Sequence, residues 1–153
     1  MAHHYKTALR WTGNLGTGTS SYRAYSRNHE LSAPQKTAPI AASSDKSFRG
    51  EESRYNPEEL LVAALSSCHM LSYLHLCADA GIVVTGYEDE AEGTMRVNPD
   101  GSGEFVEVKL HPRVELADPS RADEADALHH RAHELCFIAR SVNFPVLCET
   151  ARV

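Results

Sequence analysis

A long uncharged stretch occupies the middle of the chain. Residues 60–78 contain no Asp, Glu, Lys or Arg, and most of them are apolar. Asn56 and Pro57 stand just before this stretch, where an N-cap and a first helical residue are favoured, and Glu59 completes a capping box. Gly81 can end the helix in a left-handed conformation. The pattern predicts one helix of about 24 residues, apolar on all sides because protein surrounds it.

The same stretch approaches the length of a membrane span. It is interrupted, however, by serine and histidine at Ser66, Ser67, His69, Ser72 and His75, and no second span follows. We therefore expect a core helix and no membrane association. Residues 1–11 contain no apolar stretch of the kind found in signal peptides, so we expect none.

Alternating patterns predict strands on both sides of this helix. Residues 5–11 and 18–25 carry β-branched and aromatic residues around a Gly-rich turn. Residues 81–97 and 103–116 flank the turn NPDGSG, and the second of them alternates apolar and polar positions. Residues 33–53, rich in Ala, Pro and Ser, are predicted to form an irregular loop.

A second long helix is predicted after this strand region. Asp118 followed by Pro119 is typical of a helix start, and we expect the helix to end near Asn143. Residues 144–153 are then expected to contain a last strand. The order of elements indicates an α+β fold with two long helices packed on antiparallel sheets. The length favours a single domain covering residues 1–153.

The net charge and the cysteine content indicate which partners and which cellular compartment to expect. The net charge is −6 and the isoelectric point is about 5.8, with no basic stripe. Nucleic-acid binding needs clustered Lys and Arg, so we expect none. The four cysteines, at positions 68, 77, 136 and 148, form no CxxC pair, and a chain with a core of this size needs no disulfides. We therefore expect reduced thiols and a cytoplasmic protein.

Each cysteine can be inert or reactive. Free cysteine often fills core space, which is our interpretation of Cys77 and Cys148. Cys68 and Cys77 lie nine residues apart on one helix, so they face opposite sides and cannot bond to each other. Cys136 shares a predicted helix face with histidine and arginine, and such cations lower a thiol pKa and create a reactive thiolate.

A metal site is a further alternative. His129 and His133 have the i, i+4 spacing that lets two imidazoles share an ion, and Cys136 lies about one turn further on. No Glu follows the first histidine directly, as a zinc peptidase requires, and no fourth ligand is evident. We favour a solvated basic helix face and expect neither a metal nor a cofactor.

The two helical segments resemble a known family. NPEELLVAALSSCHML (56–71) and AHELCFIARSVNFPV (132–146) are similar to the two cysteine-bearing helices of the OsmC/Ohr family, the osmotically inducible and organic-hydroperoxide-resistance proteins. ALRWTGNLGTGTSSY (8–22) extends the resemblance over most of the chain. The resemblance implies an OsmC-like intertwined homodimer and thiol-dependent reduction of organic hydroperoxides, and of hydrogen peroxide, without a cofactor.

The resemblance also implies roles for individual residues. By position, Cys68 matches the peroxidatic thiol, Cys136 the resolving thiol and Glu58 the acidic active-site residue. The arginine that holds the thiolate has three candidates: Arg49, which fits the OsmC-like spacing best, and the alternatives Arg23 and Arg27.

Two positions depart from the family pattern. Phe137 follows Cys136 where the family often has proline, and His69 follows Cys68 where an aromatic residue is common. The physiological substrate and the dithiol reductant, whether a lipoyl protein, thioredoxin or a small thiol, are left open by these changes. The alternative function is a non-catalytic OsmC-like dimer that senses redox state or binds a small molecule.

The spacing of Glu58 and Cys68 along the predicted helix favours an active site shared between two subunits. Glu58 and Cys68 are ten residues apart, or about 15 Å along one helix. If the central helices of two subunits pair antiparallel, Glu58 of one subunit approaches Cys68 of the other, which predicts a two-fold homodimer. Three leucines lie beside Cys68 on the predicted helix: Leu61, Leu65 and Leu71. We expect them in the core or in the dimer contact, and some of them, together with Phe137, can line a pocket for alkyl peroxides.

Overall fold

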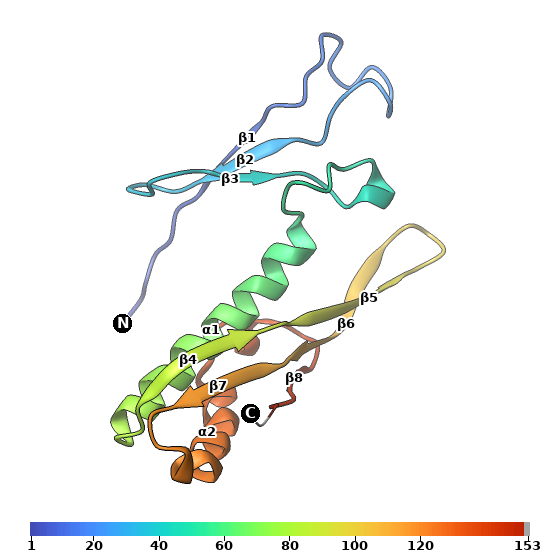
Figure 1. Cartoon of the computed structure of the whole chain (residues 1–153). Helices are drawn as coiled ribbons and strands as arrows, with labels where there is room; N and C mark the ends of the chain where they lie inside the picture. Colours follow the sequence, from blue (N-terminus) through green and yellow to red (C-terminus); the bar gives the residue numbers. More distant parts are fainter. Residues whose placement is uncertain (152–153) are drawn as a thin grey trace. The chain divides into compact units, whose positions relative to one another are not determined.

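The computed structural model describes residues 1–151, which form two compact units (Figure 1). The first unit is Met1–Leu60 and the second begins at Leu61. The central helix α1, Pro57–Asp79, has its first turn in the first unit and continues through the second. The expectation of a single domain over residues 1–153 stays a prediction.

The first unit contains a three-stranded antiparallel sheet. Its strands are β1 (Ala8–Trp11), β2 (His29–Ser32) and β3 (Ile40–Ala42), in the order β1-β2-β3. A short 3₁₀ helix, Lys46–Phe48, follows β3. The prediction of an irregular loop over residues 33–53 was therefore wrong in part, because β3 pairs with β2 in register.

The strand predicted at residues 18–25 was wrong. Gly16 and Gly18 have φ values of 124° and 56°, and both of their amides donate to the side-chain oxygen of Asn14, at 3.0 Å each. Positive φ and a side chain that bonds the following backbone are the marks of a turn. The partner of β1 is consequently β2, further along the chain.

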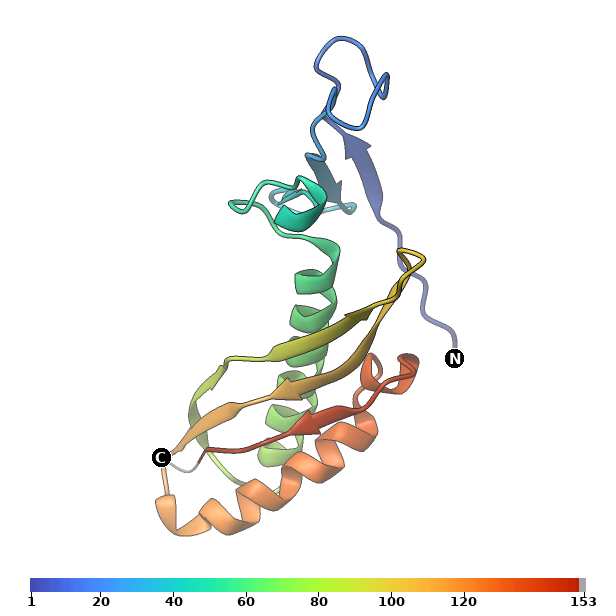
Figure 2. The same cartoon turned by 90° about the vertical axis from the view of Figure 1, so that its right-hand side faces the viewer.

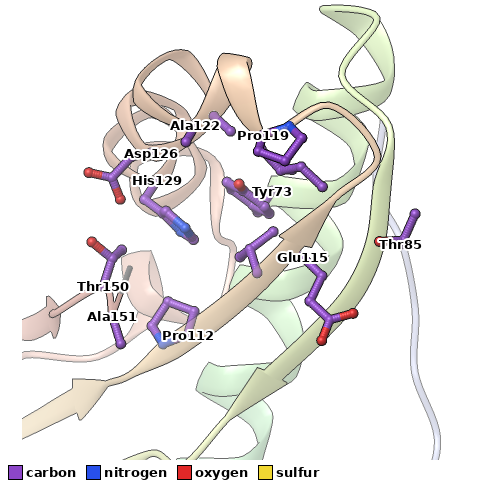
Figure 3. A pocket seen from close by; sticks show the side chains of 13 residues that line it. Tyr73, Thr85, Pro112, Glu115, Pro119, Ala122, Asp126, His129, Thr150 and Ala151 are labelled. Carbon is purple, nitrogen blue, oxygen red and sulfur yellow. The ribbon is translucent and has the colours of Figure 1, made fainter. Parts of the chain in front are cut away.

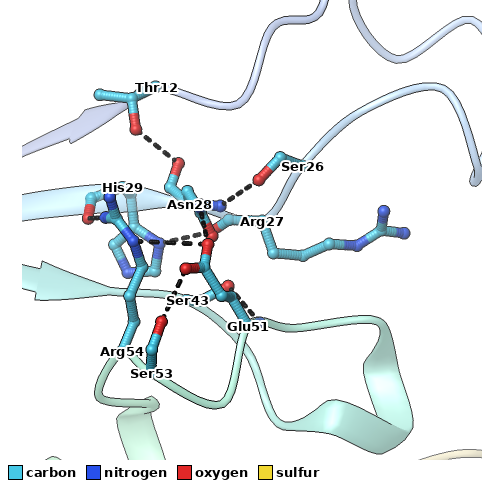
Figure 4. Close-up of polar contacts among 9 residues, drawn as sticks. All are labelled: Thr12, Ser26, Arg27, Asn28, His29, Ser43, Glu51, Ser53 and Arg54. Carbon is cyan, nitrogen blue, oxygen red and sulfur yellow. Dashed lines mark hydrogen bonds and ion pairs between the residues drawn. The ribbon is translucent and has the colours of Figure 1, made fainter.

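Side-chain hydrogen bonds tie the segment before α1 to β2 (Figure 4). The Glu51 carboxylate accepts from Asn28 Nδ2 at 2.5 Å and from Ser53 Oγ at 2.6 Å. The Glu51 amide donates to Ser43 Oγ at 3.1 Å, and Arg54 Nη1 donates to the His29 carbonyl at 3.3 Å. These bonds hold the chain in place immediately before the helix that carries Cys68.

The predicted start and end of α1 are confirmed. The Glu59 amide donates to Asn56 Oδ1 at 2.8 Å, and the Asn56 amide donates back to the Glu59 carboxylate at 3.1 Å. This is the expected capping box, and it satisfies backbone donors that have no partner inside the helix. At the other end Gly81 has φ 68°, and the Ile82 amide donates to the Cys77 carbonyl at 2.8 Å.

The surroundings of α1 differ from the prediction. Within one chain only a single line of residues is buried, spaced four apart: Leu65, His69, Tyr73 and Cys77. Leu71, on another side, is 61% exposed. The helix is long and apolar enough to span a membrane, with mean hydropathy 1.5, although core helices of soluble proteins share this length and composition. One chain therefore buries one face of α1 and leaves another face, which carries Leu71, exposed.

Five strands of the second unit form two small sheets. Strand β4 (Val84–Asp89) pairs antiparallel with β7 (Pro112–Leu116). Strands β5 (Glu92–Val97) and β6 (Gly103–Leu110) form the predicted hairpin around NPDGSG. The expected last strand is β8 (Val146–Cys148), which pairs parallel with β6. Apart from this pair, the sheets are antiparallel, and the predicted α+β class is confirmed.

The second long helix ends earlier than predicted. A 3₁₀ turn at Pro119–Arg121 leads into α2, Ala122–Leu135, and a second 3₁₀ turn covers Ala139–Ser141. Cys136 has ψ 109° and is the C-cap of α2, so it does not lie within a helix continuing to Asn143. After Cys136 the chain packs Ile138, Ala139, Val142 and Phe144 against the core cluster of Leu65 and Val108.

Helix α1 contributes to both core clusters of the second unit, where α1 and α2 lie against the strands (Figure 2). The first cluster joins α1 to α2: Tyr73, Cys77, Ile82, Ala125 and Ala132. The second joins α1 to β6 and β8: Leu65, Val108, Leu110 and Val146. Residues 65–77 of α1 are thus fixed against both helix and sheet, which gives Cys68 and His69 defined positions.

Candidate functional site

Two thiols far apart in the sequence meet in the second unit. Cys68 lies in α1 and is half-buried, whereas Cys136, the C-cap of α2, is 1% exposed. The side chains of Cys68 and Cys136 are hydrogen-bonded to each other, and both are free thiols. The Cys136 sulfur also accepts from the Ala139 amide at 3.4 Å, which orients it at the end of the helix.

The two thiols are not equivalent. Burial, and then the hydrogen bond with Cys68, raise the pKa of Cys136 to about 11. Both causes favour the protonated form of the Cys136 thiol. Cys136 therefore keeps its proton at neutral pH, and the arrangement suits a first reaction at Cys68 followed by one at Cys136.

The other predicted site residues lie in the first unit. Glu58 is half-buried in the first turn of α1, and Arg23 and Arg49 are exposed. Arg27 is the most constrained of the three arginines: its guanidinium donates to the Tyr22 and Tyr25 carbonyls, at 2.7 Å each, and lies over both tyrosine rings. The roles of Glu58 and of the three arginines stay predictions.

A second cluster was missed by the sequence analysis. His69 Nε2 lies 2.9 Å from His129 Nδ1 and 3.7 Å from Cys148 Sγ. The Tyr73 ring stacks on His129 with ring centroids 3.9 Å apart. His129 is 6% exposed, so the prediction that it lies on a solvated helix face was wrong. Cys148 has a polar partner in His69. Cys77 is hydrogen-bonded to the Tyr73 side chain and is buried in a core cluster, as its packing interpretation expects.

Burial sets the charge state of this second cluster. It lowers the pKa of His69, and it lowers the pKa of His129 to about 4. It also raises the pKa of the Cys148 thiol to about 12. At neutral pH the cluster consequently holds two uncharged imidazoles and a protonated thiol. Asp89 lies nearby, held by hydrogen bonds from the Ser66 hydroxyl and from the His111 amide.

A cavity of about 480 Å³ opens beside this second cluster (Figure 3). His129 and Asp126, both from α2, lie on its wall together with Tyr73 from α1 and Pro112 from β7. Neither Cys68 nor Cys136 is among the residues that line it. The second unit therefore holds two separate groups of reactive side chains, the thiol pair and the histidine cluster beside the cavity.

The fold corresponds to the class of OsmC-like proteins. The family model for OsmC-like protein matches residues 50–151, which is more than half of the chain. A solved structure of an OsmC-like protein of unknown function from Vibrio cholerae is 31% identical, with a TM-score of 0.88, over 98% of this chain and 100% of that chain. The chain therefore belongs to the OsmC/Ohr family.

More distant relatives match this chain over nearly its whole length. The uncharacterized protein YmaD of Bacillus subtilis is 23% identical, over 92% of this chain and 87% of its own sequence. The organic hydroperoxide resistance protein OhrB of B. subtilis is 18% identical, with a TM-score of 0.66 over 97% of this chain and 98% of that chain. At this identity the likeness to OhrB concerns the fold alone.

Proposed function

We propose that the protein is a thiol peroxidase that reduces organic hydroperoxides through Cys68 and Cys136. The observation that carries the proposal is the hydrogen bond between these two free thiols, in which the buried Cys136 remains protonated. Membership of the OsmC/Ohr family supports the same reaction class, since relatives of this fold include proteins named for organic hydroperoxide resistance.

The proposed reaction has two steps on the protein. The Cys68 thiolate attacks the terminal peroxide oxygen, the O–O bond breaks, and the alkoxide leaves as an alcohol after taking a proton from solvent. Cys68 is then a sulfenic acid. The Cys136 sulfur attacks the sulfenic sulfur, the thiol proton and the hydroxyl leave as water, and a Cys68–Cys136 disulfide forms. An external dithiol, of lipoyl, thioredoxin or small-thiol type, returns both residues to thiols.

A cation beside Cys68 completes this proposal. A guanidinium would favour the thiolate and stabilise the negative charge that develops on the peroxide oxygens. Glu58 would orient that guanidinium by accepting two hydrogen bonds. Arg49 remains the first candidate for this role, with Arg23 and Arg27 as the alternatives. A cytoplasmic location, which cell fractionation tests, would keep both thiols reduced between turnovers.

We also propose that the active form is a homodimer. Helix α1 has a stripe of exposed residues, none of which is Asp, Glu, Lys or Arg: Ala63, Ser67, Leu71 and His75. Glu58 and Cys68 lie about 15 Å apart along α1, which is too far for one chain to place both on one peroxide. A second copy pairing antiparallel along α1 would cover the stripe and supply the missing carboxylate.

Sedimentation equilibrium tests the dimer directly. At micromolar concentration we expect the mass of two chains, and Leu71→Arg should shift the protein toward one chain, because a charge would be buried in the contact. Tyr55→Arg, at another exposed large hydrophobic residue but outside the stripe, is the matched control and should leave the mass unchanged. A wild-type monomer would contradict the proposal of a composite site.

Counting free thiols tests the peroxidase itself. The reduced chain has four free cysteines. Treatment with cumene hydroperoxide should consume two thiols per chain, and peptide mapping should locate the new disulfide between Cys68 and Cys136. Hydrogen peroxide should react more slowly if the site prefers alkyl peroxides. Four unchanged thiols after exposure to both peroxides would contradict the assignment.

The alternative is a non-catalytic, small-molecule-binding dimer, and one observation favours it. The cavity beside His129 has a volume of about 480 Å³, which is in the range of small-ligand sites, and it does not include the thiol pair. Unchanged thiols together with saturable binding of a small ligand would support this function instead.

A further inference from the structure

We infer that His69, His129 and Cys148 form a binding site for a zinc-type divalent cation. The potential ligand atoms, two imidazole nitrogens and one sulfur, all lie within 4.8 Å of one another. They come from three different elements, α1, α2 and β8, which are adjacent in the fold of the second unit. The site is separate from the Cys68–Cys136 pair and does not depend on the proposed peroxidase.

Two of the three distances between ligand atoms are near those of tetrahedral zinc, and all three atoms lie within 4.8 Å of one another. Zn–N bonds of about 2.0–2.1 Å and a Zn–S bond of about 2.3 Å place two nitrogens about 3.3 Å apart, and a nitrogen and a sulfur about 3.6 Å apart. The corresponding distances here are 2.9 Å between His69 Nε2 and His129 Nδ1, and 3.7 Å between His69 Nε2 and Cys148 Sγ. To bind the ion, the two imidazole nitrogens would move apart by about 0.4 Å and the Cys148 sulfur would close on it.

The types of ligand atom indicate which class of cation the site would bind. Imidazole and thiolate ligands favour Zn²⁺ and other late transition metals, whereas Mg²⁺ and Ca²⁺ prefer oxygen ligands. His69 is 1% and His129 6% exposed, so an ion held between them would be shielded from water. On binding, the Cys148 thiol releases its proton to solvent and the sulfur coordinates as a thiolate.

Nearby carboxylates balance the resulting charge. A Zn²⁺ ion with one thiolate carries a net charge of +1. Asp89 and Asp126 are close enough to act electrostatically on both His129 and Cys148. Asp89 is fixed by the Ser66 hydroxyl and the His111 amide, so its charge stays in place beside the ion. A cationic site is therefore favoured where an isolated buried cation would be costly.

The cavity reaches one of the three ligands, His129, and offers space beside it for a fourth ligand. His129 and Asp126 lie on the cavity wall, and Figure 3 shows both side chains from α2 beside Tyr73. Three protein ligands leave one tetrahedral position open to a water molecule or a small anion. Because the three ligands belong to α1, α2 and β8, a bound ion would also cross-link the core of the second unit.

Metal stoichiometry and spectroscopy test this site. We expect about one Zn²⁺ per chain after equilibrium dialysis of the reduced protein, measured by elemental analysis. Cobalt(II) should give the intense visible bands of a tetrahedral site and a near-ultraviolet thiolate-to-metal band. His129→Gln and Cys148→Ser should each weaken zinc binding about 100-fold or more, and Cys148→Ser should also remove the thiolate band.

Matched variants show whether zinc binds at this cluster or elsewhere on the chain. His130→Gln, at the exposed neighbouring histidine, and Cys136→Ser should bind zinc as the wild type does. Thermal unfolding of each variant shows whether it is folded, and zinc should raise the midpoint of the wild type but not of Cys148→Ser. Cys148→Ser should still lose two thiols to cumene hydroperoxide, so failure of the metal site and failure of the peroxidase are distinguishable.

Three results would overturn the inference. The first is no zinc retained by the wild type, and the second is wild-type affinity in both folded variants, His129→Gln and Cys148→Ser. The third is loss of zinc binding in Cys136→Ser, which would assign the ion to the thiol pair and not to the histidine cluster.

Discussion

Cys68→Ser is expected to abolish hydroperoxide-dependent thiol loss, with a fall in peroxide consumption on the order of 10³-fold or more. A serine hydroxyl does not ionise near neutral pH and cannot form a sulfenic acid. Cys136→Ser should behave differently, because the first step occurs at Cys68: one peroxide should be consumed per chain, and no Cys68–Cys136 disulfide should form. Stopped-flow kinetics with a dimedone trap, read by mass spectrometry, checks both variants.

The difference between these two variants follows from the geometry of the thiol pair. Burial and the hydrogen bond to Cys68 raise the pKa of Cys136 to about 11, so Cys136 is the weaker nucleophile at neutral pH. Cys77→Ala is the control, since Cys77 lies in the same helix but packs in an apolar cluster, and its peroxide rate should match the wild type. A dimedone adduct on Cys136 in the Cys68→Ser variant would reverse the assigned roles.

Local signals predicted the elements that local interactions hold. The Asn56–Glu59 capping box and the turn at Gly81 act within a few residues, so the bounds of α1 were readable from the sequence. The end of α2 could not be predicted in this way, because it depends on contacts with segments far away in the sequence. The chain turns at Cys136, and the apolar residues that follow pack against Leu65 and β6. The false strand at residues 18–25 arose because β-branched and aromatic residues outweighed the turn signals of Gly16 and Gly18.

The candidate site also has one part that local sequence predicted and one part that it did not. The motifs around Cys68 and Cys136 were recognisable because each is a short continuous segment with a family resemblance. The cluster of His69, His129 and Cys148 depends on packing between segments 60 and 79 residues apart, which no local pattern encodes. Spacing along α2 instead suggested His129 with His133, whereas the contact that the structure shows is between His129 and His69 of α1.

Acid is expected to destabilise the metal-free protein through His129. Burial lowers the pKa of His129 to about 4, against about 6.5 in the unfolded chain. The unfolded chain therefore takes up the proton first as pH falls. The neutral imidazole makes its full contribution to stability above pH 6.5, and this contribution is lost as the pH falls toward 4. Between pH 7 and pH 5 the unfolding free energy should fall by about 2 kcal/mol. Urea unfolding with a chelator present, across this range, measures it.

His129→Gln separates this effect from the titration of the carboxylates. The variant should be less stable at pH 7, because His69 loses its imidazole partner, but its unfolding free energy should change less between pH 7 and pH 5. His130→Gln removes an exposed histidine from the adjacent position and should keep the full slope of the wild type. Equal slopes in all three proteins would show that His129 titrates normally in the folded state, which is incompatible with the buried contact between His69 and His129.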